Sequence, residues 1–296
     1  MKIIVTGSLG HVGQPLATAL VQQGHAPTVI SSNPGKRAAI EALGAMAAIG
    51  SLDDAAFLAA TFTGADAAFV MVPPPPPAEN RVAQYQRVAA GYVQAVRQAG
   101  VPRVVHLSSW GAEHAQGVGP INGSHAGEQV LNAGLGEVAL THLRPCSFYP
   151  NLLSYISMIK NVGFVGSNYG PATHQVFVAP ADIAAVAAAE LTSPSGPAVR
   201  YIASDERPAA DITRVLGAAI SRPDLPWREL TDEQVQGNLE RANLPTPLVL
   251  DLVELGVALR TGLLRQGYDQ NRPATLGQVK LEDYAQEFAA AFYAGQ

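Results

Sequence analysis

Three glycines at a constant spacing follow the first apolar run of the chain. The run "KIIV" is succeeded by "TGSLGHVGQPL", in which Gly7, Gly10 and Gly13 stand between a strand pattern and a helix pattern. Such glycines allow a tight turn, a close approach of a pyrophosphate to the backbone, and close packing of helix on strand. The helix that follows offers free N–H groups and a positive dipole end to phosphates. Because the motif lacks the lysine of an ATP-binding loop, it predicts a dinucleotide site. The predicted loop also includes Thr6, His11 and Val12.

The first 150 residues alternate short apolar runs with longer helical patterns. Near-continuous apolar runs are typical of parallel strands covered on both faces. The predicted strands are "KIIVT", "APTVIS", "AMAAIG", "ADAAFVMV", "RVVHLSS" and "VALTHLR". The predicted helices lie over residues 12–23, 36–43, 53–60, 79–99 and about 123–133. Left-handed C-caps are expected just past their ends, at Gly24, Gly44, Gly64, Gly100 and Gly134. This rhythm predicts an α/β fold with a Rossmann-type, doubly wound parallel sheet.

The pattern changes after residue 150, which predicts a second, smaller lobe. We expect residues 1–150 to form the Rossmann domain, continued by about residues 174–204. Residues 151–173 and 205–296 are then a smaller, mostly helical substrate lobe, with prolines 223, 226, 245 and 247 as breaks. Its segment "LPTPLVLDLVELGVAL" is strongly apolar, which suits a lid over an apolar substrate, a subunit contact or ordinary core.

The proline run "VPPPPPAEN" directly follows the fourth predicted strand. Its position predicts a stiff loop on the ligand-binding edge of the sheet, with Val72 and Pro73 next to the cofactor. A rigid surface turn is the equal alternative.

Charge and cysteine content exclude several classes of protein. The net charge is −5, only 15% of residues are charged, and no basic cluster suggests nucleic acid or an anionic membrane. A single cysteine, Cys146, rules out an internal disulfide and favours a reducing compartment. No apolar run approaches a membrane span, and the opening "MKIIVTG" is too short for a signal-peptide core. We therefore expect a cytoplasmic protein. Its expected partner is a small apolar substrate, and we expect a monomer or homodimer.

The end of the second strand favours NADP(H) over NAD(H). An NAD site has an acidic residue there for the ribose hydroxyls, whereas "VISSNPGKRAAI" has no carboxylate before Glu41. Hydroxyls and cations suit the additional 2′-phosphate, since a guanidinium binds phosphate as a fork. The predicted contacts are Ser31, Asn33, Lys36 and Arg37. The alternative is that Lys36 and Arg37 only form a solvated helical turn.

Two further segments carry groups for chemistry. Ser108 and Ser109 end the fifth strand, where they either bind substrate or merely end the strand. In "SHAGEQVL", His125 and Glu128 share a helix face. No additional His, Cys or carboxylate stands at ligand spacing, so no metal site is predicted. Asp182 is expected to cap a helix, and Cys146 to be a buried small residue rather than a nucleophile.

Four segments together resemble the atypical short-chain dehydrogenase/reductase superfamily. They are "VTGSLGHVG", "VVHLSS", "SHAGEQVLNAGLGEVALTHLRP" with "FYPN", and "APADIAAVAAAEL". Within the superfamily they resemble the NmrA-like branch, which includes triphenylmethane reductase and the type 2 NAD(P)H:quinone oxidoreductases. The resemblance covers nearly the whole chain, specifically over the first 190 residues and diffusely thereafter. It implies that Pro145 and Tyr149 wall the nicotinamide pocket.

The resemblance also shows what this chain lacks. A typical superfamily member uses Tyr-x-x-x-Lys to protonate a carbonyl, and this sequence contains no such motif. Ser109 matches the position of the catalytic serine, and His125 with Glu128 matches a pair found in NmrA-like reductases. His125 is then a proton donor, or a residue that touches the cofactor without chemistry, and Glu128 anchors the fold or a substrate-side hydrogen bond.

Three functions remain open at the level of the sequence. The first is an NADPH-dependent reductase that transfers hydride to an apolar, electron-poor acceptor such as a quinone or dye. Catalysis would then rest on proximity and orientation. The second is a non-catalytic NADP-binding redox sensor, and the third is a carbonyl reductase that uses His125 as the acid.

Overall fold

The chain divides into two compact units, each assembled from three segments. The computed structural model describes residues 1–74 and 80–294. Unit 1 comprises residues 1–115, 121–144 and 183–200, and unit 2 comprises residues 116–120, 145–182 and 201–296. Residues 174–182, which the sequence assigned to the Rossmann domain, fall in unit 2, where residues 174–178 pair with other strands of that unit. In the described part of the chain, no helix is both long enough and apolar enough to cross a membrane.

A seven-stranded sheet in the order β10-β6-β5-β4-β1-β2-β3 forms the centre of unit 1. Neighbouring strands from β1 to β6 all pair in parallel. The strands are β1 (Lys2–Val5), β2 (Ala26–Ser31), β3 (Met46–Ile49), β4 (Ala67–Met71), β5 (Arg103–Leu107), β6 (Ala139–Pro145) and β10 (Val199–Ile202). This order, with its reversal between β1 and β4, confirms the doubly wound α/β fold. All six predicted strands are present.

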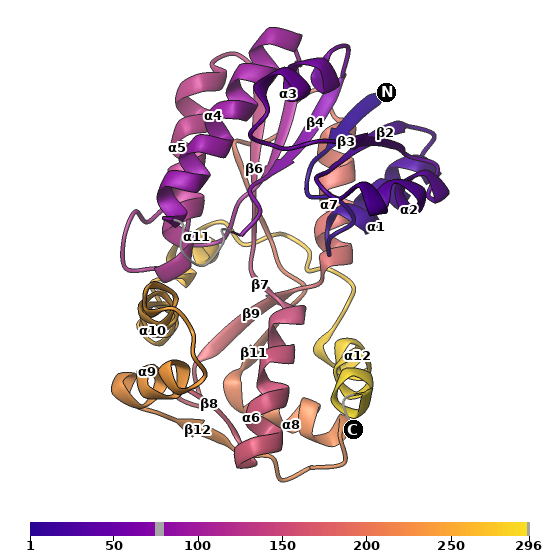
Figure 1. The fold of residues 1–296 in the computed structure, drawn as a ribbon. Coiled ribbons are helices and arrows are strands. Elements are labelled where there is room, and N and C mark those ends of the chain that lie inside the picture. Colours follow the sequence, from indigo (N-terminus) through magenta and orange to yellow (C-terminus); the bar gives the residue numbers. More distant parts are fainter. Residues whose placement is uncertain (75–79, 295–296) are drawn as a thin grey trace. The chain divides into compact units, whose positions relative to one another are not determined.

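Helices cover both faces of this sheet (Figure 1). Helices α3, α4 and α5 pack on one face, around a core that includes Leu58, Tyr92 and Leu131. Helices α1, α2 and α7 lie on the other side of the ribbon in Figure 1. The helical elements are α1 (Gly13–Gln22), η1 (Pro34–Lys36), α2 (Arg37–Ala42), α3 (Ala55–Phe62), α4 (Arg81–Ala99), α5 (Asn122–Leu135) and α7 (Pro180–Thr192). The predicted helices match within a few residues, except that residue 79 lies outside the described part.

Four of the five predicted glycine caps are confirmed, and the fifth is wrong. The four glycines at 24, 44, 64 and 100 have φ values of +78°, +84°, +71° and +66°. Gly134 instead lies within α5, which continues to Leu135 and is followed by Gly136 at φ +52°. A Cβ on Gly134 would lie 2.6 Å from the Val93 side chain of α4. Gly134 therefore serves close helix packing rather than chain reversal.

The first turns of α5 approach α4 in the same way. A Cβ on Gly123 would lie 2.9 Å from the ring of Tyr85, and one on Gly127 would lie 3.5 Å from it. Tyr85 also hydrogen-bonds Ser124. The glycines of "NGSHAG" thus fit α5 onto α4, which fixes where His125 and Glu128 stand.

Unit 2 contains two small sheets and most of the remaining helices. Antiparallel β9–β11 and parallel β7–β9 pairs make one sheet, and β8 pairs with β12 in parallel. Its strands are β7 (Ser147–Phe148), β8 (Val165–Ser167), β9 (His174–Val178), β11 (Asp205–Pro208) and β12 (Trp227–Glu229). Its helices are η3 (Tyr149–Ser154), α6 (Tyr155–Val162), α8 (Ala209–Ala219), α9 (Asp232–Arg241), α10 (Thr246–Arg260), α11 (Arg265–Gln270) and α12 (Leu281–Ala294), and a further short turn is η2 (Gly119–Ile121).

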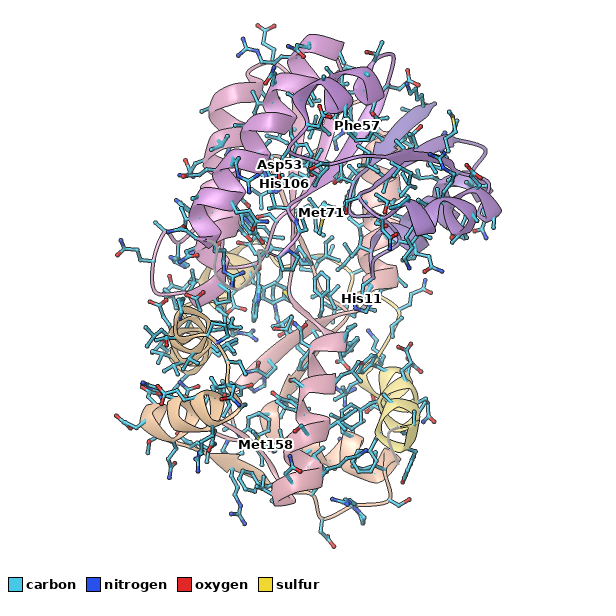
Figure 2. The ribbon with its side chains drawn as sticks, viewed as in Figure 1. His11, Asp53, Phe57, Met71, His106 and Met158 are labelled. Atoms are coloured by element: carbon cyan, nitrogen blue, oxygen red, sulfur yellow. The ribbon has the colours of Figure 1, made fainter. Side chains whose placement is uncertain are left out.

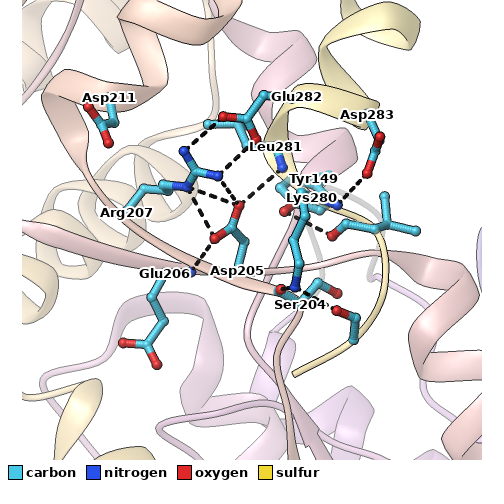
Figure 3. Close-up of polar contacts among 12 residues, drawn as sticks. Tyr149, Ser204, Asp205, Glu206, Arg207, Asp211, Lys280, Leu281, Glu282 and Asp283 are labelled. Carbon is cyan, nitrogen blue, oxygen red and sulfur yellow. Dashed lines mark hydrogen bonds and ion pairs between the residues drawn. The ribbon is translucent and has the colours of Figure 1, made fainter. Parts of the chain in front are cut away.

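Polar contacts tie the start of α12 to β11 (Figure 3). The backbone N–H of Leu281 donates to Asp205, at 3.1 Å. Arg207 donates to both Asp205 and Glu282. The Nζ of Lys280 donates to the carbonyl oxygens of Ser204 and Gly277. These bonds hold the last helix of the chain against the sheet of unit 2.

Candidate functional site

The glycine loop after β1 leaves one backbone position open. Gly7 has φ +94°, and the following Ser8 has φ +56°, so the chain turns sharply here. A Cβ on Gly13 would overlap the carbonyl oxygen of Ser8, which shows that the start of α1 packs directly on the loop. Gly10, by contrast, is exposed, and its Cβ would meet only the carbonyl oxygen of Gly7, at 3.2 Å.

The open side of Gly10 is a cradle that a side chain would fill. A pyrophosphate needs such a surface of bare backbone beside a helix N-terminus. The described residues of the loop therefore fit the phosphates of a dinucleotide at Gly10, while Gly7 permits the turn and Gly13 the packing of α1. Exposed His11 stands beside them.

Hydrogen bonds join the loop to the end of β2, where the predicted 2′-phosphate contacts lie. The Ser8 hydroxyl donates to that of Ser31, at 2.9 Å. Asn33 caps η1 by accepting from the Gly35 N–H, at 2.8 Å. Lys36 and Arg37 are exposed, and Arg37 pairs with Glu41 one turn later, at 3.5 Å. Among these groups only Ser31 is buried, so the cations are accessible to a ligand.

Several predicted contact residues are instead buried in the framework of unit 1. Thr6 is 0% exposed, and its hydroxyl accepts from the Met71 N–H at 2.9 Å, which links β1 to β4. Val12 and Val72 are 6% and 5% exposed. The carbonyl of Pro73 accepts from Gln84 at 3.2 Å, and residues 75–79, which include the last three prolines of the run, lie outside the described residues. The side chains of Thr6, Val12 and Val72 thus support the loop from the sheet side, and their predicted contact with the cofactor stays a prediction that only their backbone could meet without a side-chain movement.

Glu128 is the centre of a buried ionic network, which the sequence did not predict. Its Oε1 accepts from the Ser108 hydroxyl at 2.5 Å and from Arg144 Nε at 2.9 Å, and its Oε2 accepts from Arg144 at 2.6 Å. Arg144 also donates to Glu113, at 2.9 Å. Burial alone would raise the pKa of Glu128, but the hydrogen bonds from Arg144 and Ser108 and nearby positive charge hold that pKa below its ordinary value. Glu128 is thus a fixed carboxylate that holds β5, β6 and α5 together.

This network determines which of the two serines at the end of β5 can donate a hydrogen bond to a ligand. The hydroxyl hydrogen of Ser108 is committed to Glu128, so Ser108 has only lone pairs left for a ligand. Ser109 is half-buried, and its carbonyl accepts from the Ala112 N–H in the turn that follows β5. Ser109 is therefore the better candidate for a hydroxyl donor.

His125 is held by the same turn. Its Nδ1 lies 2.9 Å from the carbonyl oxygen of Ala112, which requires Nδ1 to carry a hydrogen. In the neutral ring Nε2 then has a lone pair, and it can donate a proton only when the ring is charged. The bond links the first turn of α5 to the turn that carries Ser109, so both predicted catalytic residues belong to one part of unit 1.

A second buried pair lies behind the network. His106 and His142 face each other across β5 and β6 with their Nδ1 atoms 2.9 Å apart. Figure 2 shows His106, on β5, and Met71, on the adjacent strand β4. Burial, with the neighbouring His142, lowers the pKa of His106 to about 3. The pair is neutral near neutral pH and supports the sheet.

The predicted site residues of unit 2 are buried. Tyr149 is 0% exposed and stacks on Phe177 and Tyr284, with ring centroids 5.5 and 5.1 Å away. The Tyr149 ring is therefore part of the core of unit 2, and its predicted place in the wall of the nicotinamide pocket stays a prediction. Pro145 is also buried, and Cys146 is 2% exposed, as expected of a small core residue.

Asp182, predicted to cap a helix, binds segments outside its helix with its carboxylate. It lies in the first turn of α7, but its carboxylate accepts from the Ser204 hydroxyl and from the N–H groups of Gln278 and Val279. It therefore joins three distant segments. Within the described residues, no group of three or more His, Cys, Asp or Glu side chains could hold a metal ion.

The fold and the glycine loop are those of a dinucleotide-binding protein, and comparison with known proteins gives the same class. The family described as NAD(P)H-binding matches residues 7–144. A (4-alkanoyl-5-oxo-2,5-dihydrofuran-3-yl)methyl phosphate reductase of Streptomyces griseus is 30% identical over 262 residues, 88% of each chain. The chain therefore belongs to the family of this reductase, with an NAD(P)H-binding domain over residues 7–144.

Solved structures share the whole fold. Triphenylmethane reductase of Citrobacter sp. superposes with a TM-score of 0.80 at 17% identity, over 98% of this chain and 100% of the other. An NADPH-dependent quinone oxidoreductase of Escherichia coli, solved with NADPH, gives 0.81 at 20% identity, over 96% and 99%. These structures share the fold of the chain, and the family match over residues 7–144 gives NAD(P)H as its cofactor.

Proposed function

We propose that this protein is an NADPH-dependent reductase that transfers hydride to an apolar, electron-poor acceptor such as a quinone or a dye. When bound, NADPH supplies the hydride, which is two electrons and one proton; a second proton from solvent turns a quinone into a hydroquinone, and NADP⁺ remains. Gly7, Gly10 and Gly13 bind the pyrophosphate in this proposal, and Arg37 with Lys36 binds the 2′-phosphate.

One observation favours a quinone or dye over a simple ketone as the hydride acceptor. The described residues around the end of β5 offer no acid of the usual kind: the sequence has no Tyr-x-x-x-Lys, and Ser108 and Glu128 are committed to a buried ion pair with Arg144. Reduction of a simple ketone develops a basic alkoxide, for which losing a positioned acid costs about 10²–10⁴-fold in rate. A quinone or a carbocation accepts hydride without that assistance.

The relatives support this class of acceptor. The proteins of Escherichia coli and Citrobacter are named for quinones and triphenylmethane dyes, and the Streptomyces protein for an alkanoyl-substituted oxo-dihydrofuran phosphate. These are compounds with conjugated, electron-poor centres.

Steady-state oxidation of NADPH with three groups of acceptors tests the proposal. Quinones and cationic dyes should turn over about 10²–10⁴-fold faster than simple ketones. The variant His125→Ala should lower the quinone rate only modestly, through position, and His174→Ala, on an exposed residue of β9, is its matched control. If the protein binds NADPH but oxidises it with none of the panel, the redox-sensor function replaces this one. If ketones are the better substrates and His125→Ala abolishes turnover, the protein is a carbonyl reductase with His125 as its acid.

A further inference from the structure

Met71 differs from the other methionines of the chain in its place beside the glycine loop. The sequence has four methionines. Met1 and Met46 are 45% and 63% exposed, and Met46 stands on the edge strand β3, two strands from β1. Met158 belongs to unit 2, where its sulfur accepts from the Gly166 N–H. Met71 is the last residue of β4, is half-buried, and is labelled in Figure 2.

The thioether of Met71 contacts the turn at Gly7. A Cβ on Gly7 would lie 3.0 Å from both Cγ and Sδ of Met71, and 3.8 Å from its Cε. The thioether therefore packs on the side of Gly7 where a side chain would otherwise stand. At this point φ is +94° and the chain turns towards Gly10. A change in the size or polarity of the Met71 side chain is consequently transmitted to the backbone of the loop.

Hydrogen bonds and core contacts prevent the backbone of Met71 from moving away. Its N–H donates to the Thr6 hydroxyl at 2.9 Å, and its carbonyl accepts from the Tyr92 hydroxyl at 2.7 Å. Side chains alternate along a strand, so Val70 and Val72 face the opposite side of the sheet, where both belong to the core under α3 and α4. A shift of β4 therefore cannot relieve a clash between Met71 and the loop.

The fold brings Met71 to the crevice in which a dinucleotide binds. The strand order reverses between β1 and β4, and doubly wound sheets bind their ligands at such a reversal, outside the carboxyl ends of the strands. Gly7 follows the carboxyl end of β1, and Met71 is the carboxyl end of β4. A nucleotide bound there is expected to cover the exposed part of Met71.

A thioether in this position is open to oxidation by a peroxide. The peroxide transfers one oxygen atom to sulfur: its O–O bond breaks, an S–O bond forms, the sulfur loses two electrons, and hydrogen peroxide leaves as water. The product is a sulfoxide, which is polar and larger than the thioether by one oxygen atom. Turned towards Gly7, that oxygen displaces the loop; turned outwards, it enters the crevice of the nucleotide. Either orientation interferes with the cofactor.

We propose that Met71 is an oxidation-sensitive site at which peroxide weakens the binding of NADP(H), and that bound cofactor protects it. The inference rests on the assignment of the glycine loop to the cofactor, and the hydride acceptor does not enter it. It applies to a reductase and to a redox sensor alike, because it concerns only how the cofactor is bound.

Peptide mass spectrometry of protein treated with hydrogen peroxide locates the added oxygen. Met46 should be oxidised first, because it is more exposed, and Met71 more slowly. NADP⁺ at about 100 times its Kd leaves about 1% of the sites free, so it should slow the oxidation of Met71 at least about 10-fold. The rate at Met46 should not change.

Titrations with NADPH on the same samples measure the consequence. Affinity should fall at least about 5-fold, the effect of a polar group buried without a partner, and the fall should follow the oxidation of Met71 rather than that of Met46. Met71→Leu removes the sulfur at similar volume, so its affinity should be the same before and after peroxide. Met46→Leu is the matched control and should lose affinity on treatment as the wild type does.

Three results would overturn the inference. They are a Met71 that stays reduced while Met46 is fully oxidised, a sulfoxide at Met71 with unchanged NADPH affinity, and an equal loss of affinity in treated wild-type and Met71→Leu protein. The wild-type time courses decide the question even where Met71→Leu folds poorly. Because every readout is binding, a failure to oxidise NADPH with any acceptor contradicts the proposed function and leaves this site standing.

Discussion

Alanine at two neighbouring glycines should separate cofactor binding from folding. Gly10 and Gly13 belong to the same loop, but a methyl group would meet different surroundings at each. At Gly13 it would overlap the carbonyl oxygen of Ser8 and lie 3.3 Å from that residue's carbonyl carbon. At Gly10 its only neighbour would be the carbonyl oxygen of Gly7, at 3.2 Å, and the position is exposed.

The structure sets the size of each effect. Gly13→Ala forces backbone against backbone, which cannot rotate away, so it should destabilise the protein by about 1–3 kcal/mol or more. Gly10→Ala should change the free energy of unfolding by less than about 0.5 kcal/mol, as at other exposed positions. Its methyl group would nevertheless stand where the pyrophosphate approaches, so NADPH should bind at least about 10-fold more weakly, a loss of roughly 1.4 kcal/mol.

Urea unfolding and fluorescence titration with NADPH measure the two quantities on the same samples. Gly24→Ala, at the end of α1, is the control for a substitution with strained backbone but open space around the new methyl group. Wild-type NADPH affinity in Gly10→Ala would refute the assignment of this loop to the cofactor. Loss of stability in Gly10→Ala as large as in Gly13→Ala would refute the geometry.

Three further predictions concern charges. Arg37→Ala should weaken the binding of NADPH by roughly 1.5–3 kcal/mol and leave the binding of NADH unchanged. Paired titrations with the two cofactors measure this, with Arg97→Ala as the control, and equal losses of affinity for both cofactors would contradict the preference for NADP. Glu128→Gln should lower the free energy of unfolding in urea by about 3–5 kcal/mol, because it leaves the buried charge of Arg144 without its carboxylate, and a smaller loss would mean that the network relaxes. Burial lowers the pKa of His106 to about 3 in the folded protein, whereas the pKa is near 6.5 in the unfolded chain. The contribution of neutral His106 to the free energy of unfolding is therefore complete above pH 6.5 and is lost as the pH falls towards 3. Thermal unfolding measured from pH 7 to pH 3 should show stability falling by up to about 1.4 kcal/mol per pH unit. The variant His106→Leu should lose stability less steeply with falling pH, and the same slope in both proteins would contradict the assignment to His106.

The central sheet could be predicted from the sequence because its determinants are local. Each strand is a run of apolar residues, and each helix before Gly24, Gly44, Gly64 and Gly100 ends where only glycine adopts φ > 0 easily. Gly134 was misassigned because a glycine that admits a neighbouring helix has the same local signature as a cap. Only the position of Val93, far away in the sequence, distinguishes the two roles.

The candidate site was only partly predictable, for a related reason. The open backbone at Gly10 follows from spacing alone. Whether the Ser108 hydroxyl is free for a ligand depends on Glu128 and Arg144, which belong to a different helix and a different strand. Sequence spacing showed that Glu128 shares a face with His125, but not that an arginine would neutralise it. A polar residue in an apolar strand, such as Arg144 at the end of β6, is the signal that could have indicated a buried ion pair.

The order in which the segments of unit 1 appear along the chain constrains its synthesis on the ribosome. Residues 183–200 complete this unit, and they supply Glu190, which binds the buried guanidinium of Arg103 at 2.7 Å. A nascent chain that has emerged only to residue 150 already contains β6, but its outer edge has no β10 to pair with, and Arg103 has no carboxylate. An unpaired edge strand is a template for association with other chains. The edge of the sheet at β6 and the guanidinium of Arg103 are therefore completed by a segment that the ribosome makes about 40 residues after β6.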